Sequence, residues 1–313
     1  MKNLLIIFCL LSSYHVFSQY TEVINSNRPG ESFGAYSVGN NVLQLETGVA
    51  FGEDNHVLEL IPNRAQTDYQ YQIRYGILGE RLEMSIDGVF ASAEETLRIG
   101  GTENIYKFSN FQSNTLGMKY LVYDPNVKKI KEGPNLYSWK KNNLPQWSDL
   151  IPAVSLFAGA NILLGENPFQ YFEEPNFSPK VALITQNNFG PKWVLVSNFI
   201  YDKFTTDYPI YAGIFTLTHA LYARTGVFVE FQTYINDLYS DELLRGGIAF
   251  LLSKNLQVDV SGLVNFKNSP KRWRAGLGVS YRFDMHKINT YIFKDKEEEA
   301  RFLEEMQQRV NNN

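Results

Sequence analysis

Apolar and polar residues alternate with a period of two in about a dozen segments between residues 41 and 284. In the segment 256–267, apolar side chains occupy one set of alternating positions and polar side chains occupy the other, with Leu263 as the interruption. Successive side chains of a strand point to opposite faces, so this segment has an apolar and a polar face. A soluble sandwich contains such strands too, but their recurrence over this length is typical of a barrel with a lipid-facing exterior and a hydrated interior.

We therefore expect an all-β fold, an up-and-down antiparallel transmembrane β-barrel of about twelve strands. The sixth and seventh segments alternate least clearly, because Val194, Val196 and Ile200 compete with apolar residues of the opposite phase. Strands are predicted near residues 41–53, 67–78, 81–92, 112–123, 151–164, 178–187, 192–202, 210–223, 226–236, 242–253, 256–267 and 272–284.

The connections between these segments alternate in length, and this orients the barrel. Both termini of a bacterial barrel are periplasmic. The long connections 54–66, 93–111 and 166–177 are therefore expected outside the cell, and the tight turns on the periplasmic side. The connection 124–150 is long, although its place in the order is periplasmic. It is either a periplasmic excursion or it hides another hairpin, and Pro125, Pro134 and Pro145 favour the excursion.

Both ends of the chain carry segments outside the barrel. Lys2, an apolar run at 4–11 and a polar exit predict a signal peptide over residues 1–19, since a spanning helix needs about 20 apolar residues. Residues 20–40 then form a periplasmic or lumen segment, the barrel occupies 41–284, and 285–313 form a periplasmic tail. A short helix is expected at 294–310 of this tail, either solvated or docked on a partner.

Composition narrows the class of protein. The 29 basic and 33 acidic residues nearly balance, which argues against a nucleic-acid partner. Cys9 is the only cysteine and lies in the signal peptide, so the mature chain is expected to hold no disulfide. No spaced cluster suggests a metal or another cofactor. The 19 tyrosines and 22 phenylalanines suit strands and interfacial girdles, so we expect an integral protein of the outer membrane of a Gram-negative bacterium.

The last predicted strand carries a glycine followed by alternating aromatic residues, Gly278, Tyr281 and Phe283. This arrangement resembles the signal by which the barrel-assembly machinery recognises a terminal strand. The expected partners are therefore that machinery and outer-membrane lipid, together with a small hydrophobic solute if the barrel is a channel.

Charged side chains recur on the phase expected to face the barrel interior. Unpaired buried charges are costly, so these groups must be hydrated or paired across the lumen. They either line a conducting path or form an electrostatic plug. Arg28 and Glu31 precede the first strand, and they either fold back into the lumen as a small plug or belong to a disordered leader. The lumen-facing candidates are Glu46, Arg74, Glu83, Asp87, Lys119, Glu230, Arg245, Asp259, Arg274 and Arg282.

An enzyme is the least favoured alternative. An outer-membrane phospholipase is also a twelve-stranded barrel, and it uses serine, histidine and asparagine. His219 lies on the outward phase between Leu217 and Leu221, where such a site would be. No nucleophile motif accompanies this histidine, so we expect no enzyme and assign no catalytic residue.

The start of the expected mature chain is similar to that of a known barrel family. The matching segments of this chain are Asn27-Arg28-Pro29-Gly30-Glu31-Ser32, then Tyr36-Ser37-Val38, and then Leu43-Gln44-Leu45-Glu46-Thr47-Gly48. Together with residues 135–139 and 149–155, they resemble the meta-pathway of phenol degradation family, often called simply transporters in Bacteroidetes. The resemblance implies an outer-membrane barrel with a role in the uptake of hydrophobic or aromatic compounds. The expected function is passive passage of such molecules, and the alternative is a structural or docking subunit of an envelope complex.

Overall fold

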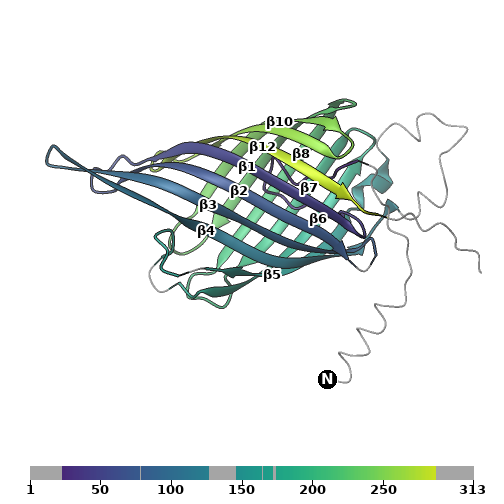
Figure 1. Ribbon diagram of the computed structural model, residues 1–313, viewed down its shortest axis with the longest axis horizontal. Coiled ribbons are helices and arrows are strands. Elements are labelled where there is room, and N and C mark those ends of the chain that lie inside the picture. The colour runs from purple at the N-terminus through teal and green to yellow at the C-terminus, as the bar shows by residue number, and fades with distance from the viewer. Residues whose placement is uncertain (1–22, 78, 127–145, 164, 172–173, 287–313) are drawn as a thin grey trace, which may run out of the picture.

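Twelve strands make up nearly all of the regular structure in this computed structural model, which describes residues 23–77, 79–126, 146–163, 165–171 and 174–286 (Figure 1). The strands are β1 (Val42–Asn55), β2 (Asn63–Ile77), β3 (Leu82–Ile99), β4 (Thr102–Tyr123), β5 (Ala153–Ile162), β6 (Phe177–Phe189), β7 (Trp193–Asp202), β8 (Ile210–Tyr222), β9 (Thr225–Ile235), β10 (Asp241–Ser253), β11 (Leu256–Asn265) and β12 (Lys271–Asp284). One 3₁₀ turn, η1 (Trp147–Leu150), precedes β5. No helix among the described residues is long and apolar enough to cross a membrane.

Each strand pairs antiparallel with its sequence neighbours, and β1 pairs with β12, so the sheet closes on itself. The closing register runs from Val42 opposite Asp284 to Asn55 opposite Lys271 without a shift. Closure leaves no strand edge unpaired, which is the condition for crossing a membrane with strands. The predicted twelve-stranded barrel is confirmed. The predictions for residues 1–19 and 294–310, and for most of 124–150, lie outside the described residues.

The distribution of side chains is the reverse of that in a soluble protein. On β1, Gln44 and Glu46 are buried, while Leu45 and Val49 between and beyond them are exposed. The same alternation, with polar groups inside and apolar groups outside, recurs around the sheet, as expected where the exterior contacts hydrocarbon. Exposed apolar side chains from other strands include Ile73, Ile86, Leu116, Leu183, Phe199, Val229, Val260 and Leu277.

The expected long connection at 93–111 is wrong. Strands β3 and β4 continue through it as a paired hairpin that ends in a tight turn at Gly100 and Gly101, both with positive φ (Figure 1). Ion pairs between exposed side chains, Arg98 with Glu103 and Lys107 with Glu94, lie along this extension. Alternation fades there because residues 98–107 are exposed on both faces of the hairpin. Similarly, β2 begins at Asn63, which shortens the first connection. We call the end of the barrel with this hairpin the outer end.

Candidate functional site in the barrel lumen

Residues 24–40, which we call the tongue, lie inside the barrel. At one end the Ile24 amide donates to the Lys254 carbonyl oxygen in the turn between β10 and β11, at 2.8 Å. At the other end the chain enters β1 beside β2, where the Asn41 amide donates to the Gly76 carbonyl oxygen at 3.0 Å. Between these two points the chain reaches up into the lumen and returns.

The inner wall supplies hydrogen-bond partners for the irregular backbone of the tongue. Buried backbone groups without regular structure need such partners, because an unpaired amide or carbonyl is costly. Five strands contribute them. The bonds are Glu31 N to Glu230 Oε2 (3.0 Å), Phe33 N to Asn198 Oδ1 (2.6 Å), Ala35 N to Gln186 Oε1 (3.0 Å), Val38 N to Glu83 Oε2 (2.9 Å) and Ser155 Oγ to the Ala35 carbonyl (2.6 Å). The wall therefore fits the tongue at many points.

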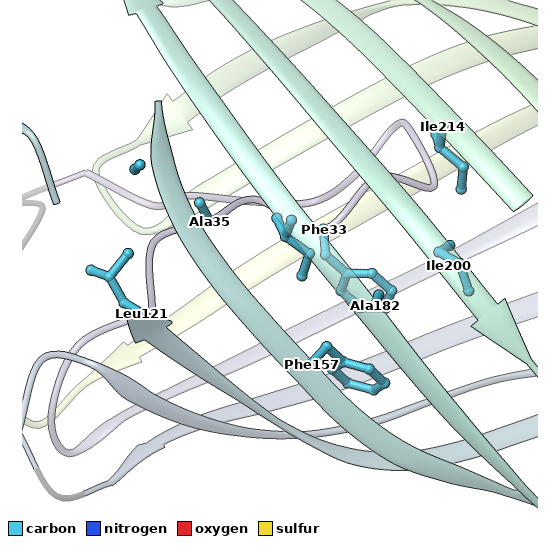
Figure 2. Close-up of a cluster of buried hydrophobic side chains, with 9 residues drawn as sticks. Phe33, Ala35, Leu121, Phe157, Ala182, Ile200 and Ile214 are labelled. Atoms are coloured by element: carbon cyan, nitrogen blue, oxygen red, sulfur yellow. The ribbon is translucent and has the colours of Figure 1, made fainter. Parts of the chain in front are cut away.

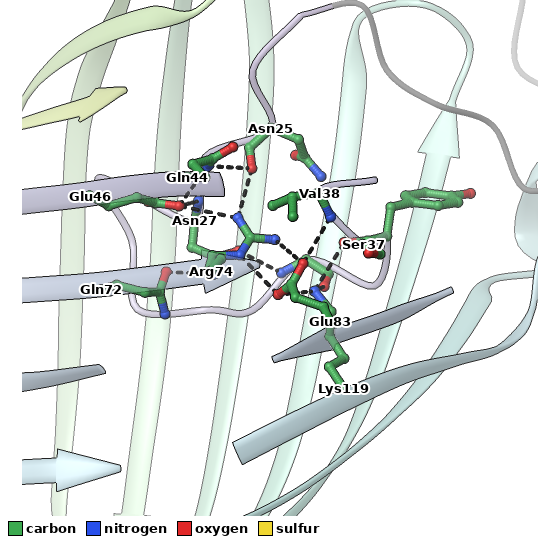
Figure 3. A network of polar contacts seen from close by, with 12 residues as sticks. Asn25, Asn27, Ser37, Val38, Gln44, Glu46, Gln72, Arg74, Glu83 and Lys119 are labelled. Carbon is green, nitrogen blue, oxygen red and sulfur yellow. Dashed lines mark hydrogen bonds and ion pairs between the residues drawn. The ribbon is translucent and has the colours of Figure 1, made fainter. Parts of the chain in front are cut away.

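A fully buried charged network centres on Arg74, on the lumen side of β2 (Figure 3). Its Nε lies 2.9 Å from Glu83 Oε1 and its guanidinium reaches Glu46 Oε1 at 3.1 Å. Lys119 Nζ lies 3.1 Å from Glu83 and donates to the carbonyl oxygens of Gly34 (2.7 Å) and Tyr36. Four of the candidate lumen residues thus form one buried cluster, which also holds the tongue.

The other candidates lie in separate groups. Arg245 contacts Glu31 at 2.9 Å and Glu230 at 3.7 Å, and Asp259 contacts Arg28 at 3.2 Å. These contacts bring Arg28 and Glu31 together with three of the strand residues. The remaining three lie apart from them: Arg274 pairs with Asp54 at 2.8 Å, Arg282 lies 3.5 Å from Asp284, and Asp87 Oδ1 is buried without a hydrogen-bond partner among the described residues.

Tyr36 anchors residues 33–40, which we call the returning arm of the tongue, to the end of β4. Its hydroxyl donates to Asp124 Oδ1 at 3.4 Å and accepts a hydrogen bond from Asn126 Nδ2 at 2.6 Å. Burial, with the nearby Asp124 carboxylate, raises the pKa of the Tyr36 phenol above its usual value. The phenol therefore remains a hydrogen-bond donor at neutral pH.

One side of the lumen is apolar, which the alternation did not predict. Phe33 of the tongue stacks on Phe157 with ring centroids 5.5 Å apart, and Ile200 and Ile214 belong to the same cluster (Figure 2). We call seven inward side chains of β5 to β8 the apolar strip, and all of them except Val196 belong to this cluster or pack against it. It comprises Phe157 of β5, Ala182 and Ile184 of β6, Val196 and Ile200 of β7, and Ala212 and Ile214 of β8.

Two cavities lie in the lumen, on opposite sides of the tongue. The outer cavity has a volume of about 290 Å³ and is lined by Ile200 and Ile214 of the apolar strip, among others. The inner cavity has a volume of about 320 Å³ and extends to the turn between β8 and β9. Asn27, Arg28 and Gly30 line both cavities. Residues 27–31, which we call the tip of the tongue, therefore separate the two cavities.

Sequence reasoning missed an ionic group at the outer rim. Arg272 lies 3.0 Å from Asp54 and 3.0 Å from Asp241, and Arg274 shares Asp54. Asp54 and Asp241 fell just outside the expected strand limits, so their inward phase was not counted. Extending the alternation by two residues at each strand end would have found them.

Among the described residues, no serine hydroxyl is hydrogen-bonded to His219. Its ring lies 4.0 Å from that of Trp193 on the adjacent strand, and its Nδ1 is buried without a hydrogen-bond partner among the described residues. An aromatic stack of this kind is ordinary packing near the end of a strand. Within the same residues, no group of three His, Cys, Asp or Glu side chains is arranged to hold a metal ion.

A closed sheet with a polar interior and an apolar exterior defines the class of outer-membrane β-barrels. Within this class, the chain belongs to the family described as "Putative MetA-pathway of phenol degradation", whose sequence profile matches residues 26–283. The family membership expected from the N-terminal motifs is confirmed. No curated protein matches the chain.

The chain is similar to solved structures of outer-membrane barrels. The COG4313 outer membrane channel from Pseudomonas putida F1 has 9% identity and a TM-score of 0.50, and the match covers 83% of this chain and 100% of that one. The translocator domain of the autotransporter NalP from Neisseria meningitidis has 9% identity and a TM-score of 0.46, over 82% of this chain and 90% of that one. The transport unit of the autotransporter AIDA-I from Escherichia coli has 10% identity and a TM-score of 0.46, over 83% and 93%. At these identities the likeness concerns the fold alone.

Proposed function

We propose that the protein is an integral outer-membrane channel for the passive passage of small hydrophobic or aromatic molecules. The apolar strip carries this proposal. A barrel that only needed a structural filling could pair charges throughout, as it does around Arg74, whereas Ile200, Ala212 and Ile214 of the strip border the outer cavity and offer an apolar solute a surface there. The family description, which refers to phenol degradation, is consistent with such a solute.

The apolar strip also lies where a solute would cross the lumen. Ile200, Ala212 and Ile214 border the outer cavity, and Val196 borders the inner cavity. Apolar contacts are therefore present on both sides of the tongue. Contacts of this kind are non-directional and weak individually, so a solute can move from one to the next without a tightly bound state.

Polar substitution in the strip tests the proposed function. Ile200→Asn and Ile214→Asn are expected to lower the uptake of a labelled monocyclic aromatic compound about tenfold, because each adds a polar group to an apolar subsite. Uptake is measured in intact cells that produce the protein, since apolar solutes cross a plain phospholipid bilayer unaided. Folding of each variant is checked by its heat-modified shift on a gel.

A polar solute of similar size provides the control in the same cells. Its uptake should change little in the two variants, because the charged wall opposite the strip is intact. Equal aromatic uptake by wild type, variants and cells without the protein would contradict the channel and favour the docking subunit.

The orientation of the barrel gives a separate prediction. A short epitope inserted between Gly100 and Gly101 should be labelled by antibody on intact cells, because that turn lies at the outer end. The same epitope between Ala223 and Arg224, in a turn at the opposite end, should be labelled only after the outer membrane is permeabilised. Labelling of the second epitope on intact cells would reverse the orientation.

A further inference from the structure

Arg28 lies at the tip of the tongue, and its guanidinium is held on several sides. Nε and Nη2 donate to the two oxygens of Asp259 at 3.3 and 3.2 Å, and Nη1 donates to Gln70 Oε1 at 2.7 Å. Nη2 also reaches the Leu277 carbonyl oxygen at 3.5 Å. The Arg28 side chain is 10% exposed and that of Asp259 is 0% exposed. A planar fork matched to a carboxylate in this way is the strongest form of such a pair.

The wall beneath this guanidinium is made of glycine. Gly48 of β1 and Gly278 of β12 are directly opposite each other in the closing register. A Cβ atom built on either glycine would overlap the guanidinium, and the three nearest atoms in both cases belong to Arg28. The two missing side chains therefore leave a flat depression in which a guanidinium fits and from which a methyl group would exclude it.

The depression holds Arg28 at a point between the two lumen cavities, where a solute would pass. Arg28 lines both lumen cavities, together with Asn27 and Gly30 from the same tip. The side chain of the neighbouring Glu31 is 40% exposed where it contacts Arg245 at 2.9 Å, and its amide donates to Glu230 Oε2 at 3.0 Å. The returning arm is fixed separately, by the stack of Phe33 on Phe157 and by the bonds to Lys119. The tip and the returning arm are therefore held by separate sets of contacts.

We propose that Gly48, Gly278, Asp259 and Gln70 form a guanidinium-binding site in the barrel wall, and that Arg28 in this site latches the tip of the tongue across the lumen. Release of Arg28 joins the outer and inner cavities into one passage. The gating part of this inference rests on the proposed channel function, whereas the binding site itself does not.

Single methyl groups test the latch without removing any charge. Gly48→Ala and Gly278→Ala should displace the guanidinium, because the atoms in the way are the end of a flexible side chain and not the wall. Open probability in planar bilayers is expected to rise about tenfold or more, since loss of a buried ion pair shifts a two-state equilibrium by at least that factor. The matched control is Gly226→Ala, where the new Cβ would meet its nearest atom at 3.8 Å.

Chemical rescue tests the binding site without relying on conductance. In Arg28→Ala the site is vacant, so millimolar methylguanidinium should raise the unfolding temperature of the purified barrel by mass action. Methylammonium at the same ionic strength should not, because it lacks the planar fork. In the double variant Arg28→Ala with Gly278→Ala, the added methyl fills the depression and the effect of methylguanidinium should disappear.

The outcomes separate the two claims. A methylguanidinium shift that persists in the double variant, or that methylammonium matches, would overturn the binding site. A specific shift together with silent bilayers for wild type and all variants would keep the site and overturn the channel and its gate. Conducting bilayers in which Gly48→Ala and Gly278→Ala behave like Gly226→Ala would overturn the latch alone.

Discussion

Replacing Arg74 with methionine is expected to lower the free energy of unfolding by about 3–5 kcal/mol, the range for breaking a buried ion pair from one side. The Arg74 side chain is 0% exposed and contacts Glu46 and Glu83, and it donates to the Asn25 carbonyl oxygen at 2.8 Å. Methionine retains the approximate length of the side chain but leaves two buried carboxylates with fewer partners. Urea unfolding from liposomes, followed by tryptophan fluorescence, measures the change.

An exposed ion pair supplies the control for this measurement. Arg98 and Glu103 lie 2.8 Å apart on the outer hairpin, with side chains 64% and 53% exposed. Arg98→Met should cost no more than about 1 kcal/mol, because water screens such pairs. The double variant Arg74→Met with Glu46→Gln should recover part of the loss, because Arg74 is the only cation paired with Glu46 among the described residues, whereas Glu83 keeps Lys119 at 3.1 Å. Equal costs at Arg74 and Arg98 would show that the central network is hydrated and not packed.

Leu277→Arg is expected to cost about 2–4 kcal/mol, the range for an arginine placed in the lipid near the midplane of a barrel. Leu277 lies midway along β12 and is exposed on the outer face. Its guanidinium would have to leave water for hydrocarbon or reach along the wall to the interface. The same unfolding experiment gives the cost.

The matched variant for this position is Ser261→Arg on the inward phase of β11, opposite Gly276. The glycine leaves room and the lumen is polar, so the cost should be clearly smaller. Ser280 is not a suitable control, because it is buried and its hydroxyl lies 2.8 Å from Ser26 of the tongue. Equal costs at Leu277 and Ser261 would indicate two packed faces, as in a soluble sandwich.

Alternation was sufficient to predict the strands because lipid and water impose opposite demands on the two faces of each one. It failed where that contrast ends. Residues 98–107 are exposed on both faces, so the pattern of the segment 93–111 resembled a loop although it continues β3 and β4. The inward charges of β1 to β4 and of β9 to β12 were predicted from phase alone. Their partners were not, because pairing such as that of Arg274 with Asp54 depends on the register between strands.

The apolar strip had a signal that was visible but ambiguous. The segment around 193–200 is apolar on both phases, which weakens a strand prediction. In the structure Val196 and Ile200 face the lumen while Phe199 faces out, so the ambiguity marked a wall with two apolar faces. The glycine depression could not be predicted, since Gly48 and Gly278 are far apart in sequence and acquire meaning only when β1 pairs with β12.

The place of Arg28 has a consequence for assembly. Its guanidinium contacts β2 through Gln70, β11 through Asp259 and β12 through the Leu277 carbonyl, and it rests against Gly48 of β1. These are the four strands on either side of the seam where the first strand meets the last. A segment enclosed by the sheet must lie inside before β1 pairs with β12, or it must be inserted after the barrel has closed. Arg28 thus joins the strands on both sides of the seam. A nascent barrel that closes around the tongue gains these contacts, which an empty barrel lacks.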